Sequence, residues 1–238
     1  MSAATAHTVR RLTSLALLLA GWFWGIAVTL VLAATVVVWA VNGTVDVSVA
    51  VYARQASIWF PFSQAILVVS VFLRVHVASG MTRRTFVRAS LLVSSATGFG
   101  YAVVLTALVL VERRLHALVG WDAAMHEVQI ADESSSVGVL LLDLAVPFVV
   151  ANLSGLLVGV AYQRLGGWVG TLVLPLTAGP VLLTQYLAGA GVADLPGVWT
   201  TTDAGHLALA VGAGAVMAVL TAALYARTTH RLPLSATA

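Results

Sequence analysis

Long apolar runs, each separated from the next by a short polar segment, constrain this 238-residue chain more than any other feature. A run of about 20 residues is long enough to cross the hydrocarbon core of a bilayer as a helix. Only 9% of the residues are charged, against roughly a quarter in a soluble domain. Since backbone groups in hydrocarbon must be paired within their own segment, the sequence predicts an all-α, polytopic membrane protein.

We expect six membrane-spanning helices in a single transmembrane domain that covers residues 1–238. The spans are predicted near 20–41, 56–77, 86–111, 136–161, 168–189 and 204–226. The first apolar run begins well before residue 20, and two arrangements fit it. Either residues 5–18 form a separate amphipathic elbow helix on the membrane surface, or the whole run is one long tilted helix.

Arginines and acidic residues gather at opposite ends of the predicted spans. One set of ends holds Arg10, Arg11, Arg74, Arg83, Arg84, Arg88, Arg164, Arg227 and Arg231. The other set holds Asp46, Glu112, Asp122, Glu127, Asp132, Glu133, Asp194 and Asp203. Because basic residues are retained on the cytoplasmic side of a membrane, we expect both termini in the cytoplasm. The net charge of +3 then reflects topology, and no nucleic-acid partner is expected.

The segment between the second and third predicted spans combines helix-end signals with two arginines. It reads Ser79-Gly-Met-Thr-Arg-Arg-Thr-Phe86. Gly80 ends the preceding helical pattern, and Thr82 can cap the next helix. Arg83 and Arg84 follow at a helix start, where positive charge opposes the helix macrodipole. Two interpretations remain open: the arginines retain this loop in the cytoplasm, or they dock a cytoplasmic partner.

An inner loop with the pattern Ser-Gly-x-Thr-Arg-Arg-x-Phe after the second of six spans resembles the permease subunits of ABC-2 type transporters. The resemblance covers the whole chain as topology and residues 79–86 as a motif. It implies that this loop is a coupling element seated on a separate cytoplasmic ABC ATPase, which would bind ATP and Mg. The contacting residues would be Gly80, Met81, Thr82, Arg83, Arg84 and Phe86. It also implies a second permease copy or paralogue, a bacterial inner-membrane location, and an elbow helix before the first span.

The chain lacks two residue types, lysine and cysteine, that many nucleotide sites and covalent catalysts need. It contains no lysine, so a P-loop lysine and Schiff-base chemistry are excluded. It has no cysteine, and its six histidines show no His-Glu-x-x-His pattern. We therefore expect no enzyme activity, metal or cofactor in this chain. An intramembrane serine protease is disfavoured as well, because Ser154 and His206 are predicted at different depths, beyond hydrogen-bonding reach.

Polar residues inside the predicted spans are the candidates for a substrate path. They are Asp143, Asn152, Gln64 and Gln185. An intramembrane carboxylate is costly and usually faces a cavity or a partner, so Asp143 can line a path or carry a proton. Gly155 and Gly159 share one face of the fourth span with Asn152, and this Gly-x-x-x-Gly pair predicts close helix packing.

The sequence therefore predicts the membrane subunit of an ATP-driven exporter for an amphipathic or peptide-like substrate. Two alternatives stay open. A non-transporting anchor or sensor would need only the inner loop and the outer segment at 112–135, which is expected to include a surface helix. A proton-coupled secondary transporter would use Asp143, although no inverted repeat with broken helices is evident.

Overall fold

The computed structural model describes residues 3–121, 135–188 and 203–230, and within these ranges it contains helices and no β-strand. The helices are α1 (Ala3–Asn42), α2 (Ala53–Leu67), α3 (Leu73–Ala78), α4 (Arg83–Val119), α5 (Val137–Leu172), α6 (Leu174–Ala188) and α7 (Asp203–His230). A 3-10 turn, η1 (Ala50–Tyr52), precedes α2, and a π-helical segment, η2 (Val68–Phe72), joins α2 to α3. The predicted outer surface helix falls largely on residues 122–134, which lie outside the described residues.

Five helical stretches of the described chain are long and apolar enough to cross a membrane, judged by length and composition. They are Ala3–Asn42, Ala50–Ala78, Arg83–Val119, Val137–Leu172 and Leu207–His230. The all-α prediction is confirmed, and the five stretches support a multi-pass membrane protein. The span predicted at 168–189 is not one of the five, because α6 has only 15 residues.

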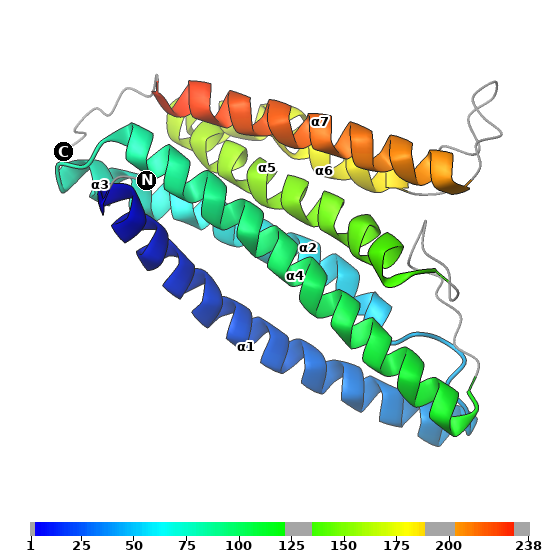
Figure 1. The fold of residues 1–238 in the computed structure, drawn as a ribbon. Helices are drawn as coiled ribbons and strands as arrows, with labels where there is room; N and C mark the ends of the chain where they lie inside the picture. The colour runs from blue at the N-terminus through cyan, green and yellow to red at the C-terminus, as the bar shows by residue number, and fades with distance from the viewer. Residues whose placement is uncertain (1–2, 122–134, 189–202, 231–238) are drawn as a thin grey trace.

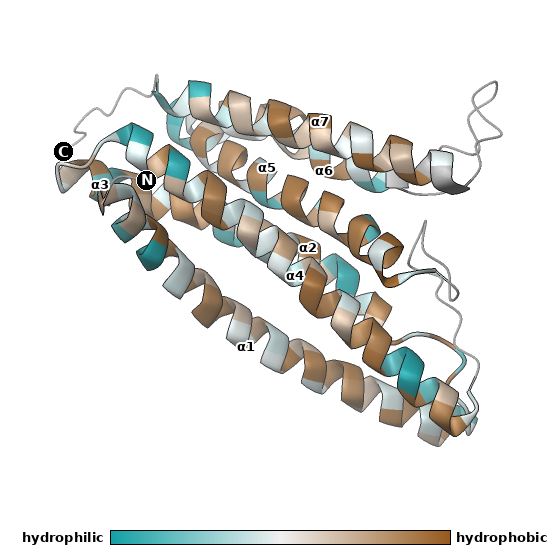
Figure 2. Ribbon diagram, viewed as in Figure 1, coloured by the Kyte–Doolittle hydropathy of each residue, from teal (hydrophilic) through white to brown (hydrophobic). Residues whose placement is uncertain are grey.

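The helices lie side by side as an elongated bundle whose two ends differ in charge. Figure 1 shows that α1 begins and α7 ends at the same end, where the connection between α3 and α4 also lies. Hydrophilic residues mark the helix termini there in Figure 2. We call this the arginine end, after Arg10, Arg11, Arg74, Arg83, Arg84, Arg88, Arg164 and Arg227. The opposite end holds Asp46 and Glu112 together with Arg54, Arg113 and Arg114, so it lacks the large excess of positive charge of the arginine end, and we call it the acidic end.

The first predicted span is part of one unbroken helix. α1 has 40 residues and is about 60 Å long at 1.5 Å rise per residue. Residues 5–18 are therefore not a separate elbow helix, and the long-helix arrangement is the one observed. Only Thr5, Thr8 and Leu12 of α1 are buried. The helix packs along α4 and meets α2 at few positions, one of them the stack of Phe23 on Phe60 with ring centroids 4.8 Å apart, so most of its surface is left for lipid.

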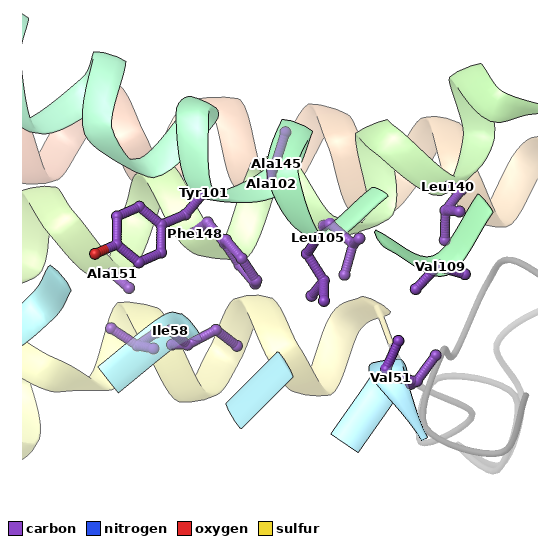
Figure 3. Close-up of a cluster of buried hydrophobic side chains, with 13 residues drawn as sticks. Val51, Ile58, Tyr101, Ala102, Leu105, Val109, Leu140, Ala145, Phe148 and Ala151 are labelled. Carbon is purple, nitrogen blue, oxygen red and sulfur yellow. The ribbon is translucent and has the colours of Figure 1, made fainter. Parts of the chain in front are cut away.

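The central helix is α5, which packs against α2, α4, α6 and α7. Its buried neighbours form a hydrophobic cluster in which Ile58, Tyr101 and Phe148 meet (Figure 3). Glycines bring α5 close to α2, because a Cβ on Gly155 would overlap the carbonyl oxygen of Phe62. A Cβ on Gly159 would lie 2.9 Å from that of Val69. The Gly-x-x-x-Gly pair thus lies at a backbone contact between two helices.

The chain turns back on itself at Gly166, near the arginine end. This residue has φ 75° and ψ −179°, a backbone conformation that is essentially restricted to glycine. After the turn, Gly170 packs on the ring of Tyr162, whose hydroxyl is 3.0 Å from that of Thr171. The residues that follow Gly166 therefore form a helical hairpin with the earlier part of α5. They are the residues that the sequence predicts as the fifth span.

Candidate functional site

The loop between α3 and α4 is a short turn with ordered helix ends on both sides. Gly80 has φ 80°, and its backbone nitrogen donates to the carbonyl of Val77 at 3.0 Å. The side chain of Thr82 accepts from the backbone nitrogen of Thr85 at 3.3 Å, which caps the start of α4. Gly80 thus ends one helix and Thr82 begins the next, as the sequence predicts.

The residues expected to contact an ATPase divide into an exposed and a buried group. The exposed or half-buried group comprises Gly80, Met81, Thr82, Arg83 and Arg84. Arg83 Nη1 donates to the backbone oxygen of His230 at 3.4 Å, so the loop contacts the end of α7. Phe86 is only 1% exposed, and its ring centroid lies 5.3 Å from that of His76. Phe86 therefore supports the loop from inside the bundle and does not present its ring to a partner, which corrects its expected role.

Beneath the loop lies a buried cluster contributed by α3, α4, α5 and α7. It includes Leu73, Phe86, Leu156 and Tyr225, each at most 1% exposed. The hydroxyl of Tyr225 is 2.8 Å from that of Ser90, and this hydrogen bond joins α7 to the first turns of α4. The loop is thereby fixed to the ends of several helices.

The π-helical segment η2 lies just before α3 and this loop. Gln163 of α5 donates from Nε2 to the backbone oxygen of Ser70 at 2.9 Å. Its Oε1 accepts from Nε of Arg74 at 3.3 Å, so one side chain connects η2, α3 and α5. Single-turn π-helical segments occur frequently at functional sites. Gln163 is not among the residues predicted from the sequence. The only sign of it there is an amide side chain near the end of an apolar run.

Two of the four predicted path residues line one cavity. Gln64 of α2 and Asn152 of α5 are 8% and 2% exposed, and they border a cavity of about 240 Å³. Ser94 and Thr97 of α4 add hydroxyl groups to the same wall. Asn152 donates to the carbonyl of Phe148 in its own helix at 3.0 Å, not to a neighbouring helix. Two of the predicted path residues thus converge on this cavity.

The other two predicted path residues lie elsewhere. Asp143 is 2% exposed on the buried face of α5, near the acidic end, and does not line that cavity. Gln185 of α6 accepts from Nε2 of Gln55 at 3.3 Å in an exposed position. The structure therefore does not join all four residues into a single path.

A buried arginine near the acidic end is a residue that the sequence analysis missed. Arg54, the second residue of α2, is only 2% exposed. An arginine within a membrane is costly and commonly marks a functional position. The sequence did carry a signal, since Arg54 interrupts the separation of arginines from acids. It shares the acidic end of the bundle with Asp143, on the neighbouring helix.

Neither a group of metal-ligating side chains in the described residues nor a match to a known protein points to a function. The ranges that the structure describes contain no group of three or more His, Cys, Asp or Glu side chains that could hold a metal ion. Ser154 is fully buried, and the side chain of His206 lies outside the described residues. No protein-family model, curated protein or solved structure matches this chain. Function must therefore be inferred from the geometry of the chain itself.

Proposed function

We propose that this chain is the membrane subunit of an ATP-driven exporter of the ABC-2 type. A separate cytoplasmic ATPase docks on residues 79–86, and ATP is hydrolysed on that partner. Two permease copies, or one copy and a paralogue, work beside two ATPase subunits in a bacterial inner membrane. The substrate class is amphipathic or peptide-like.

The observation that carries the proposal is the accessible arginine pair at the start of α4. Thr82 already caps this helix, and positive charge at a helix start opposes the macrodipole, so helix stability does not explain the pair. The sequence contains no aspartate or glutamate between residues 47 and 111. A partner with carboxylates would supply the opposite charge to Arg84, which is exposed.

The packing beneath the loop favours coupling to the bundle. Phe86 is buried against the cluster that includes Tyr225, and Gln163 connects the adjacent π-helical segment to α5. A force applied to the loop would therefore move α4, α5 and α7 together. Such movement of packed helices is a common form of switching in transport proteins.

The six-span topology is supported by the turn at Gly166. Residues 167–188 would measure about 33 Å at helical rise, which is enough to cross the hydrocarbon core. The only interruption is at Val173, whose φ and ψ of −88° and −6° stay in the right-handed region. With this crossing included, both termini fall on one side, and the positive-inside rule assigns that side to the cytoplasm.

Co-purification with a candidate ATPase tests the proposal. The best candidate is an ATPase with Gly-x-x-x-x-Gly-Lys-Ser/Thr that is encoded beside this chain. We expect Arg83→Glu/Arg84→Glu to reduce association at least tenfold and to abolish stimulated ATP hydrolysis. The matched control is Arg88→Glu/Arg227→Glu, which makes the same charge change at exposed positions of the same end. The proposal fails if no ATPase associates, or if the loop variant and the control behave alike.

The buried carboxylate of Asp143 favours a second candidate, a proton-coupled transporter. Proteoliposomes that contain this chain alone would distinguish the two functions. A proton-coupled transporter would show proton flux that Asp143→Asn abolishes, without any ATPase. An ATP-driven exporter would show none, and Asp143→Asn would leave ATPase association intact. An anchor or sensor would bind a partner without stimulating ATP hydrolysis.

A further inference from the structure

A row of cavities follows α1 on the side that faces α2, because the backbones of these two helices come close at few positions. At the arginine end, a cavity of about 440 Å³ lies between the start of α1, α3 and the loop. The cavity of about 240 Å³ that Gln64 and Asn152 border comes next, and the two share Leu12 and Phe72. A third, of about 430 Å³, lies between the later half of α1 and the start of α2. We call the first the head cavity and the other two the apolar slot.

The head cavity is more polar than the apolar slot, and its lining carries positive charge. Its lining includes Arg11 and His76. The guanidinium carbon of Arg11 lies 5.7 Å from the ring centroid of Phe72, close enough for a cation–π contact that holds the charge at the cavity wall. His76 is 9% exposed, and its Nε2 has no hydrogen-bond partner in the part of the chain that the structure describes. A buried nitrogen without a partner is destabilising, and a bound acceptor would relieve this.

No carboxylate of the lining segments balances this charge. The sequence has no aspartate or glutamate before Asp46, and none between residues 47 and 111. All residues that line the head cavity come from these two stretches. A ligand that complements the head cavity is therefore negatively charged.

The apolar slot fits a hydrocarbon chain. Its first part is lined by Leu15, Leu19, Leu67 and Val71, among other apolar residues. The α1 residues that line the slot run from Leu12 to Ala34, about 33 Å at helical rise, which is as long as the ~30 Å hydrocarbon core. The part of the slot next to the head cavity, lined from Leu12 to Leu19, therefore lies at the depth of one leaflet. A negatively charged head joined to an apolar tail is the description of an anionic phospholipid.

We propose that one anionic phospholipid of the leaflet at the arginine end binds here. Its phosphate contacts Arg11 and accepts a hydrogen bond from His76 Nε2, and one acyl chain lies in the part of the slot next to the head cavity. Basic pockets between transmembrane helices are known to bind anionic lipid headgroups. The lipid completes the packing of α1, which has few buried residues of its own. This site does not depend on the ATPase partnership.

Native mass spectrometry of the purified full chain tests the headgroup contact. The probes are dioleoyl phosphatidylglycerol and dioleoyl phosphatidylcholine, which share acyl chains and differ in net charge. We expect the wild type to retain one phosphatidylglycerol in preference to phosphatidylcholine. Arg11→Gln should weaken phosphatidylglycerol binding at least tenfold. Arg10→Gln, at the neighbouring exposed position that does not line the head cavity, should change it less than twofold.

A second variant tests whether the acyl chain of the lipid lies in the apolar slot. Val71 is 52% exposed and lines the slot but not the head cavity, so Val71→Trp should narrow the slot without touching Arg11. We expect Val71→Trp to weaken phosphatidylglycerol retention about as much as Arg11→Gln. Millimolar inorganic phosphate should not displace the lipid, because the acyl chain contributes most of the buried apolar area.

Four results would overturn the proposal. The wild type could bind both lipids equally, or Arg10→Gln and Arg11→Gln could weaken retention to the same degree. Both outcomes would indicate general attraction of anionic lipid to a basic surface. Displacement by inorganic phosphate would indicate an ion site instead, and undiminished retention by Val71→Trp would exclude an acyl chain in the slot.

Discussion

The carboxylate of Glu112, near the end of α4, accepts a hydrogen bond from the backbone nitrogen of Val49 at 2.7 Å. The same oxygen accepts from the nitrogen of Ala50 at 3.1 Å, and the hydroxyl of Ser48 donates to the other oxygen. These nitrogens stand at the start of η1 and α2, where free N–H groups and the helix dipole favour a negative charge. A side chain of α4 thus caps the α2 segment and fixes the acidic end of the bundle.

Glu112→Gln should lower the thermal unfolding temperature of the detergent-solubilised chain. Glu112 is 8% exposed. Its carboxylate divides the donors between two acceptor oxygens, whereas the amide of glutamine has only one acceptor oxygen. Leaving a buried donor without its partner costs about 1–3 kcal/mol. Asp46→Asn is the control, because Asp46 is exposed in the same connection. Equal unfolding temperatures for both variants would show that the Glu112 cap contributes nothing.

Gly155→Ala should destabilise the chain, whereas Gly25→Ala should not. A Cβ at Gly155 would overlap the carbonyl of Phe62, and backbone cannot move aside as a flexible side chain can. At Gly25, in α1, a Cβ would meet nothing within 4 Å. Thermal unfolding in one detergent compares the two directly. An unchanged unfolding temperature for Gly155→Ala would contradict the close contact of α5 with α2.

Gly166→Ala should disturb the α5–α6 hairpin, and Gly167→Ala should be tolerated. The two glycines are adjacent and exposed, but only Gly166 has a positive φ. A side chain in that conformation costs about 1–3 kcal/mol. Limited proteolysis of the purified chain would report the difference as faster cleavage near the hairpin. Identical cleavage of both variants would exclude a special role for the Gly166 conformation.

Labelling of single cysteines tests the orientation and the number of spans. The natural chain has no cysteine, so each introduced thiol is unique. With a membrane-impermeant maleimide on intact cells, Thr44→Cys should react, while Ser79→Cys and His230→Cys should be protected until the membrane is permeabilised. All three positions are exposed. Protection of Ser79→Cys together with reaction of His230→Cys would indicate five crossings instead of six.

Several parts of the fold could be predicted because they depend on neighbours in the sequence. The predicted spans at 20–41, 56–77 and 86–111 each lie inside a helical stretch that meets the membrane criteria, and the span at 136–161 begins one residue before such a stretch. Gly80 and Thr82 end and begin helices as expected. Helix signals act within one or two turns, so local sequence is sufficient for them.

Side-chain environments were predicted less well. Phe86 stands inside an exposed motif and yet is buried, because α7 brings Tyr225 against the start of α4. The burial of Arg54 likewise depends on the packing of α2 in the bundle. The π-helical segment and its contact with Gln163 join residues more than 90 positions apart in the sequence. Nothing in either segment alone marks this contact.

The amino-acid order alone indicates a helical membrane protein, the positions of most of its apolar helices, and the end that carries most of the arginines. Those properties follow from hydropathy, helix-end signals and charge, all of which act locally. The central place of α5, the slot that α1 leaves beside α2, and the burial of Phe86 and Arg54 became visible in the folded chain. The physical reason is that membrane helices are apolar on nearly every side, so hydrophobicity does not distinguish a lipid-facing side from a packed one. The shape of the helix surface distinguishes the two sides, through close contacts such as that of Gly155 with Phe62.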